Sequence, residues 1–232
     1  MSDIHANKNK FYKALDAVRF NKAQDKIFVI GDIIDRGSGS SLELLKFCRD
    51  NTEITLILGN HEYFLRMYLE GQLSRRKWCA MGGENTLKEL ESLTELQKQE
   101  ILEYIKSLPL YVVLSTSGGE KILLTHAGLD ADIICYSDDG IVSVVDSIER
   151  AFKENPFKYI VSNDIHFMAA SVLNNLDYDK IIVGHYPCQN LNEDGGCHVF
   201  NGLNYIDIDS GCGYAGGMLA VYCLESGEVI YV

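Results

Sequence analysis

Two short apolar runs, each closed by a glycine and a polar side chain, constrain the fold of this chain most. Lys26–Ile30 and Ile54–Leu58 are rich in β-branched residues, which is typical of buried strands. The first run leads into Gly31-Asp32 and the second into Gly59-Asn60. Helical patterns precede and separate the runs, at residues 8–20 and 41–50. This alternation predicts parallel strands joined by crossover helices, and hence an α/β fold.

The spacing of the polar residues after these runs predicts where they meet. Asp3, Asp32 and Asn60 are 29 and 28 residues apart, about one strand–helix unit each, so each falls where a strand would end. His126 and His185 also follow strand-like runs. Because ligands bind at the carboxyl edge of open α/β sheets, we expect these five side chains to converge there.

The rest of the chain extends this pattern without a boundary. Residues 63–110 read as mostly helical, with a capping box at Thr94–Gln97, and we interpret them as a small helical cover. Strand-like runs follow at 110–115, 121–125, 180–184, 204–208, 218–224 and 228–232. No repeat, low-complexity tract or linker interrupts them, so we predict a single domain over residues 1–232.

Composition excludes several classes of partner. The 21 basic and 33 acidic side chains give a net charge of −12, which repels nucleic acids and anionic membranes, so we expect neither as a partner. The seven cysteines form no CxxC pair and are typical of reduced thiols. With no signal-peptide pattern and no apolar run of about 18 residues, we expect a cytoplasmic protein. No pattern predicts an oligomeric state.

Five motifs occur in a fixed order along the chain. They are Asp3-x-His5, Gly31-Asp32-x-x-Asp35-Arg36-Gly37, Gly59-Asn60-His61-Glu62, His126-Ala127-Gly128-Leu129 and Gly184-His185. In these motifs the chain resembles the phosphoprotein phosphatase family of calcineurin-like metallophosphoesterases. The likeness is to small prokaryotic and phage-type serine/threonine phosphatases, which are related to symmetrical diadenosine tetraphosphate hydrolases. It covers nearly the whole chain and implies a β-sandwich of two mixed sheets flanked by helices.

The resemblance also implies a centre of two divalent cations. In such a centre Asp3 and His5 would hold the first metal, Asp32 would bridge both, and the second would be held by Asn60, His126 and His185. These residue types suit Mn²⁺, Fe²⁺ or Zn²⁺, of which we expect Mn²⁺ first. A hydroxide bridging the metals would attack phosphorus in line.

Three further residues receive roles from the same resemblance. His61 would be the general acid that protonates the departing alkoxide, and Asp35 would orient it. This fits the chemistry, because a leaving alkoxide needs a proton and histidine titrates near neutrality. Arg36 would clamp phosphate oxygens, which a guanidinium does with two parallel hydrogen bonds.

Simpler interpretations compete at some positions. Asp32 and Asp35 could be turn or N-cap residues, but the complete set of motifs favours a functional role. His166 and His198 match no ligand motif, so we assign them no function. Trp78 and the basic run at residues 75–77 are interpreted as a solvated helix end or a lid.

The chain departs from the family at two places. The Asp-x-His motif normally follows a buried strand, and here only Met1 and Ser2 precede Asp3, so the N-terminal strand is missing. We expect a start codon farther upstream; the alternative is an unanchored, frayed N-terminus with weak binding of the first metal. Asn163 stands where many relatives have a second phosphate-binding arginine. The candidates to replace that arginine are Arg75, Arg76 and Arg150.

These observations predict a dinuclear-metal phosphatase acting on phosphomonoesters. The expected partner is a phosphorylated protein, through phosphoserine or phosphothreonine, or a small phosphoester. The alternative substrate is a symmetrical dinucleoside tetraphosphate, because that hydrolase has the same metal core. A third hypothesis is a degenerate member that binds phosphorylated partners without turnover.

Overall fold

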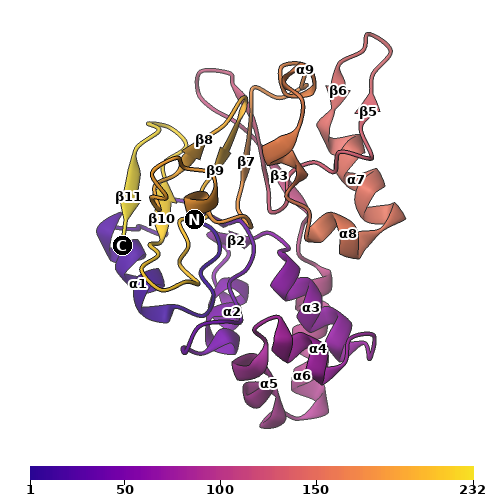
Figure 1. The fold of residues 1–232 in the computed structure, drawn as a ribbon. Coiled ribbons are helices and arrows are strands. Elements are labelled where there is room, and N and C mark those ends of the chain that lie inside the picture. Colours follow the sequence, from indigo (N-terminus) through magenta and orange to yellow (C-terminus); the bar gives the residue numbers. More distant parts are fainter.

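A five-stranded mixed sheet stands at the centre of the computed structural model, which describes residues 1–232 (Figure 1). Its strands, in spatial order, are β3 (Tyr111–Ser115), β4 (Lys121–Thr125), β7 (Lys180–Val183), β9 (Tyr205–Asp207) and β8 (Phe200–Asn201). The three inner strands are parallel, and both edge strands are antiparallel to their neighbours. This arrangement confirms the expected α/β class, a mixed sheet flanked by helices.

A smaller parallel pair of strands comes from the N-terminal part of the chain. The elements there are α1 (Lys8–Ala17), β1 (Ile27–Val29), α2 (Ser41–Asp50) and β2 (Ile54–Leu56). Val29 lies opposite Leu56 in the parallel register. Helix α2 has the predicted bounds, because the Ser40 hydroxyl accepts the Glu43 N–H at its N-terminus and its Leu44, Leu45 and Cys48 side chains are buried. The predicted crossover pattern is therefore confirmed.

The first residues of the chain extend this pair. The Met1 amino group donates to the Phe28 carbonyl (3.1 Å), and the Met1 carbonyl accepts the Ile30 N–H (2.9 Å). Asp3 N–H donates to the Gly31 carbonyl (3.2 Å), and residues 1–6 are buried. The alternative of a frayed, unanchored N-terminus is therefore wrong in this structure, because main-chain pairing and burial fix these residues.

The helical cover predicted for residues 63–110 consists of four helices. They are α3 (Asn60–Leu69), α4 (Arg75–Ala80), α5 (Glu84–Glu91) and α6 (Glu95–Lys106), which gather on one side of the sheets in Figure 1. The Thr94–Gln97 capping box is present. The expectation of a solvated Trp78 was wrong: its indole is fully buried against Tyr68, because α4 folds inward. Arg75 does lie in solvent, paired with Glu91.

The segment between β4 and β7 contains elements that the sequence patterns did not predict. They are β5 (Cys135–Tyr136), β6 (Val142–Ser143), α7 (Val144–Glu154), α8 (Pro156–Ile160), a 3₁₀ turn at Asp164–Phe167 and α9 (Ala170–Leu173). Helix α7 buries Val144, Ile148 and Ala151 on one face. The C-terminal part forms a 3₁₀ turn at Cys188–Asn190 and an antiparallel pair, β10 (Ala220–Tyr222) with β11 (Val229–Tyr231).

The two faces of the central sheet bury different sets of side chains, as the two-residue period of strands requires. Leu124, Ile182 and Ile206 pack on one face with Ile30, Ile57 and Ala220, which belong to the β1, β2 and β10 regions. This second layer makes the sandwich. Leu123 and Ile181 face the other way, into the larger core that the helices cover. None of the helices has both the length and the hydrophobicity that a membrane span requires. One domain over the whole chain stays a prediction.

Candidate metal centre

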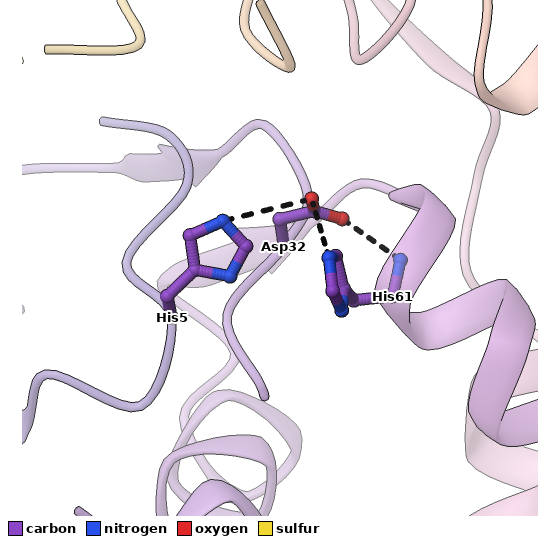
Figure 2. Close-up of side chains that lie close together, drawn as sticks. All are labelled: His5, Asp32 and His61. Carbon is purple, nitrogen blue, oxygen red and sulfur yellow. Dashed lines mark hydrogen bonds and ion pairs between the residues drawn. The ribbon is translucent and has the colours of Figure 1, made fainter. Parts of the chain in front are cut away.

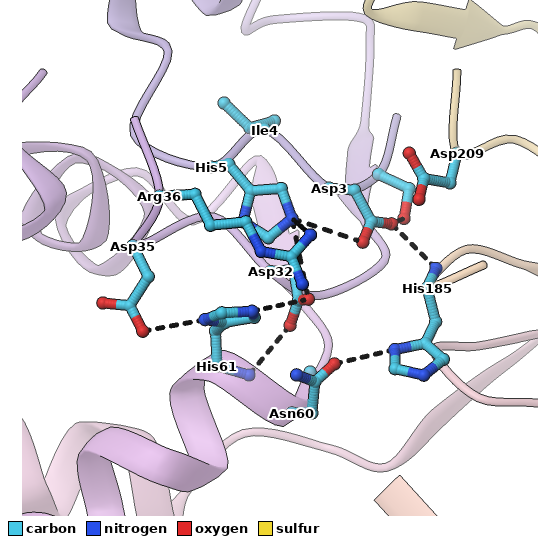
Figure 3. A network of polar contacts seen from close by, with 12 residues as sticks. Asp3, Ile4, His5, Asp32, Asp35, Arg36, Asn60, His61, His185 and Asp209 are labelled. Atoms are coloured by element: carbon cyan, nitrogen blue, oxygen red, sulfur yellow. Dashed lines mark hydrogen bonds and ion pairs between the residues drawn. The ribbon is translucent and has the colours of Figure 1, made fainter. Parts of the chain in front are cut away.

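The predicted ligand side chains come from five separate segments that end at one edge of the sheets. Asp32 follows β1, and Asn60 is the first residue of α3, directly after β2. His126 follows β4 and His185 follows β7. Because these neighbouring strands are parallel, both histidines lie at the same edge of the sheet. The N-terminal segment brings Asp3 and His5 alongside; His5 N–H donates to the Asp32 carbonyl (3.0 Å). Figure 3 shows Asp3, His5, Asp32, Asn60 and His185 around one centre.

Asp32 stands between two groups of possible ligands. On one side its Oδ2 is 3.9 Å from His5 Nε2, which is 3.8 Å from Asp3 Oδ1. On the other side its Oδ1 is 3.4 Å from His126 Nε2. Two sets of ligand atoms therefore lie close enough to hold an ion each, and they share this carboxylate. The sets are His5 with Asp32 and His61, and Asp32 with His126 and His185. Asp32 lies where a bridging ligand would.

The tautomers of the histidines leave a free lone pair at the centre. His5 Nδ1 donates to the Ile34 carbonyl (3.1 Å), His126 Nδ1 to the Ile30 carbonyl (2.8 Å), and His185 Nε2 to the Val161 carbonyl (3.2 Å). In each ring the other nitrogen is then unprotonated and directed inward. Such outer hydrogen bonds to backbone carbonyls are typical of metal-ligating histidines, because they fix the tautomer and the ring orientation.

Asn60 makes the need for a cation explicit. Its Oδ1 lies 2.8 Å from His185 Nδ1 (Figure 3) and 2.9 Å from His126 Nε2, so three lone pairs converge. Without a proton or a cation between them, such acceptors repel each other. Imidazole nitrogen, carboxylate and amide oxygen together suit a divalent ion. The residues present therefore fit the second site.

The charge balance of the interior points the same way. Seven carboxylates are buried, at Asp3, Asp32, Asp35, Glu62, Asp130, Asp207 and Asp209, whereas no lysine or arginine is buried. Burial raises the pKa of Asp32 well above its usual range, and the charges of Asp3 and Glu62 raise it further. Burial also lowers the pKa of the His5 and His185 imidazoles well below the ordinary value, which keeps both rings neutral. Asp130 pairs with Lys158, but Asp3 and Asp32 have no lysine or arginine partner. Neutral imidazoles beside such carboxylates favour a bound cation.

His61 lies beside this centre, with one ring nitrogen hydrogen-bonded to Asp35 and the other close to Asp32. Its Nδ1 donates to Asp35 Oδ2 (2.8 Å; Figure 3), while its Nε2 is 3.8 Å from Asp32 Oδ2 (Figure 2). The His61 backbone N–H also donates to Asp32 Oδ1 (2.9 Å). The geometry allows two roles for Nε2, proton donor or metal ligand, because His61 also lies within ligand reach of His5 and Asp32.

Arg36 is the arginine that contacts the centre. Its side chain is exposed, and its Nη1 lies 3.2 Å from His5 Nε2. Of the three proposed replacements for a second phosphate-binding arginine, Arg75 pairs with Glu91 and Arg150 with Glu154 on the surface, away from the centre. Arg76 is exposed, and its role stays a prediction. Of the two unassigned histidines, His166 has a buried side chain beside Asp207 and Tyr205, whereas His198 is exposed.

The backbone of the site is strained. Among the nine non-glycine residues with positive φ are six of the predicted site residues, namely Asp3, His5, Asp32, Asp35, Arg36 and His185. For a side-chain-bearing residue this conformation costs about 1–2 kcal/mol. Such strain persists where the surrounding structure holds it, commonly at functional sites. At Gly31 and Gly59 the constraint is space. A methyl group at either position would overlap a neighbouring site residue, so only glycine fits there.

Several side chains that shape the centre were missed from sequence. Glu62 accepts the backbone N–H groups of Asp32 (2.8 Å), Ile33 (2.9 Å) and Gly59 (3.0 Å), and so ties two ligand loops together. Its place directly after His61 could have drawn attention to it. Trp78 and Thr86 both donate to the Asp35 carboxylate, but neither lies in a motif. Asp209 lies beside Asp3 in Figure 3.

Comparison with known proteins is consistent with this geometry. The sequence pattern of the calcineurin-like phosphoesterase family matches residues 1–208. Symmetrical bis(5'-nucleosyl)-tetraphosphatases are similar in sequence. The one from Nitrosospira multiformis is 30% identical over 56% of this chain and 42% of its own length, and the one from Aliivibrio salmonicida is 32% identical over 56% and 43%. The matched region thus spans less than half the length of these relatives.

A solved structure supports the fold. A protein serine/threonine phosphatase from Saccharomyces cerevisiae superposes with a TM-score of 0.64, covering 100% of this chain and 77% of that protein. The two sequences are 16% identical, so this likeness concerns the fold.

Proposed function

Because this chain belongs to the calcineurin-like phosphoesterase family, we propose that it hydrolyses symmetrical dinucleoside tetraphosphates. Membership makes it a metal-dependent phosphoester hydrolase of a family with a dinuclear centre. The identity of the substrate is a further inference, which the sequence likeness to symmetrical tetraphosphatases supports. This reverses the preference that the motifs alone gave, in which phosphoserine and phosphothreonine came first.

The observation that carries metal-dependent hydrolysis, whichever phosphoester is the substrate, is the convergence of His126, His185 and Asn60 beside Asp32. Two divalent ions held by Asp3, His5, Asp32, Asn60, His126 and His185 would supply Lewis acidity and lower the pKa of bound water. Asp32 and Asn60 would contribute oxygen ligands, and the backbone carbonyls behind the three rings fix their tautomers and orientation. Burial lowers the pKa of all three imidazoles and so keeps them neutral. Mn²⁺ is our first expectation, followed by Fe²⁺ and Zn²⁺.

The residues around the centre would act on the substrate itself. The Arg36 guanidinium, exposed at the mouth, would bind phosphate oxygens. Asp35 accepts the His61 Nδ1 proton, so a protonated His61 would carry its second proton on Nε2, facing the leaving group. We assign His61 the role of general acid and Asp35 that of its positioning partner.

One observation favours a phosphomonoester substrate as the second candidate. A nucleoside diphosphate leaves as a stabilised anion, whereas the alkoxide of serine or threonine must be protonated as it departs. The His61–Asp35 pair, with both side chains buried, suits the second case better. Phosphoserine and phosphothreonine peptides therefore belong in the test.

The deciding experiment offers the Mn²⁺-loaded protein diadenosine tetraphosphate and a phosphothreonine peptide in parallel. Our proposal expects two molecules of adenosine diphosphate from the first and slower release of phosphate from the second. Cleavage of the peptide alone would overturn it in favour of a protein phosphatase. Inactivity on both, with two ions bound, would favour the hypothesis of a phosphate-binding protein without turnover.

A further inference from the structure

Arg36 has an unusual set of partners for an arginine at an active-site mouth. It forms no ion pair with any carboxylate. Its Nη1 instead contacts two neutral groups, His5 Nε2 at 3.2 Å and the Tyr214 hydroxyl at 2.9 Å. Its position therefore depends on two hydrogen bonds rather than on a salt bridge.

The bond to His5 is not compatible with a bound ion. His5 Nδ1 donates to the Ile34 carbonyl, so the His5 Nε2 lone pair is what Arg36 uses. That same lone pair is the one directed toward Asp3 and Asp32. An ion that takes it leaves no acceptor for Arg36 and adds repulsion between two cations. Tyr214 is then the remaining side-chain partner of Arg36.

The loop that carries Tyr214 is fixed against the N-terminal segment. Tyr214 N–H donates to the Gly211 carbonyl (2.8 Å), and Gly217 N–H donates to the Tyr214 carbonyl (3.2 Å). Cys212 Sγ donates to the Ile4 carbonyl (3.4 Å). The backbone of Gly213 lies so close to the His5 ring that a methyl group there would overlap it. These contacts therefore fix the Tyr214 backbone beside the N-terminal segment that contains His5.

The Tyr214 ring itself stays largely in solvent, with 47% of the residue exposed. The Arg36 guanidinium carbon lies 5.2 Å from the ring centroid, within the range of cation–π attraction. The exposed ring contributes little to the buried core. It contacts the Arg36 guanidinium through both its face and its hydroxyl, and this contact explains the position of the ring better than packing does.

From these contacts we propose that Tyr214 is a positioning residue for phosphate binding: its hydroxyl holds Arg36 at the mouth of the metal-loaded centre. The remaining N–H groups of the guanidinium are then free for phosphate oxygens. This inference rests on the proposed function only in that a phosphate group occupies the centre. It does not depend on which phosphoester is cleaved.

The test compares Tyr214→Phe, which keeps the ring and removes the hydroxyl, with the wild type. Binding of inorganic phosphate to the Mn²⁺-loaded protein is measured by calorimetry, and KM and kcat are measured with an aryl phosphate. We expect phosphate affinity to fall and KM to rise, each by about fivefold, since a hydrogen bond to a charged group is lost. The value of kcat and the Mn²⁺ affinity should stay within about twofold. Tyr136→Phe, at a tyrosine 57% exposed on β5, is the matched control.

A double-mutant cycle decides whether the effect passes through Arg36. In an Arg36→Ala background, Tyr214→Phe should change phosphate affinity no further. A persisting effect there, a loss confined to kcat, or unchanged phosphate affinity in Tyr214→Phe would each overturn the inference. Calorimetry reads phosphate binding without turnover, so inactivity on every substrate would count against the proposed function alone.

Discussion

Trp78 and His61 bind the same carboxylate oxygen: the indole Nε1 and the imidazole Nδ1 each lie 2.8 Å from Asp35 Oδ2. The indole comes from α4, inside the helical cover, and the imidazole from the first turn of α3, where the cover begins. The cover therefore takes part in the site, because its tryptophan fixes the carboxylate that orients His61. Thr86, on α5, donates to the other oxygen of Asp35.

Trp78→Phe should shift the pH dependence of activity. Burial raises the pKa of Asp35 to about 6, and the hydrogen bonds from Thr86 and Trp78 restrain that rise. Asp35 must be ionised to accept the His61 proton, so activity should fall as pH drops through about 6. Without the indole N–H, the pKa of Asp35 should rise further. The acidic side of the plot of kcat/KM against pH should therefore move to higher pH. A pH profile from 5 to 9 measures this.

Thr86→Val gives an independent check, because it removes the donor to the other carboxylate oxygen and should move the same limb in the same direction. An unmoved limb in both variants would show that Asp35 does not control the protonation of the site.

Some features of this site are determined by short stretches of sequence. Asp32 and Asn60 could be placed from sequence, because a strand–glycine–ligand pattern determines both the local turn and the sheet edge. Helix α2 could be bounded because Ser40 is a local cap. In both cases the signal lies within a few residues.

Other features depend on contacts between distant segments. Whether Trp78 points into solvent or toward Asp35 is decided by how α4 packs, which no local pattern specifies. The same holds for Tyr214 and Arg36, which are 178 residues apart. The short strands β5 and β6 have two residues each, and strands of that length carry too few side chains for a period to be visible.

Glu62 should be a main determinant of stability. Its two oxygens accept three backbone N–H groups, and all of them are buried. Glu62→Ala leaves these donors unpaired and should lower the free energy of unfolding by roughly 1–3 kcal/mol for each of them, about 3 kcal/mol or more in all. Glu62→Gln keeps one oxygen and should cost less, about 1–2 kcal/mol. Urea unfolding of the metal-free protein measures both, and equal losses would contradict the assigned bonds.

Metal removal should lower the melting temperature. The buried carboxylates near the centre have no buried lysine or arginine to balance them, so an ion that binds only the folded state stabilises it. Chelation should reduce Tm by several degrees, and Mn²⁺ should restore it. Asp32→Asn, which weakens both sites, should abolish the response, whereas Asp194→Asn, on an exposed loop, should keep it. A Tm indifferent to chelation would count against a metal centre.

Mn²⁺ binding should also release protons. The pKa of Asp32 is raised well above its ordinary value by burial first, then by Asp3 and Glu62, so the metal-free carboxyl holds a proton to higher pH than a free aspartate. A ligand must be deprotonated to bind, so Mn²⁺ affinity should increase with pH until Asp32 is ionised. Calorimetry in two buffers of different ionisation enthalpy measures the protons released. Identical heats in both would contradict this prediction.

His61→Asn should separate the two roles that the geometry allows for His61. If its Nε2 is a proton donor, the variant keeps its Mn²⁺ affinity and loses roughly 10²–10⁴-fold in kcat on an alkyl phosphate. The loss on p-nitrophenyl phosphate should be much smaller, because that leaving group needs no proton. If His61 is instead a ligand alongside His5 and Asp32, Mn²⁺ affinity falls and both substrates lose activity together. The ratio of the two losses, measured at saturating Mn²⁺, therefore identifies the role: a large ratio requires proton donation, and a ratio near one excludes it.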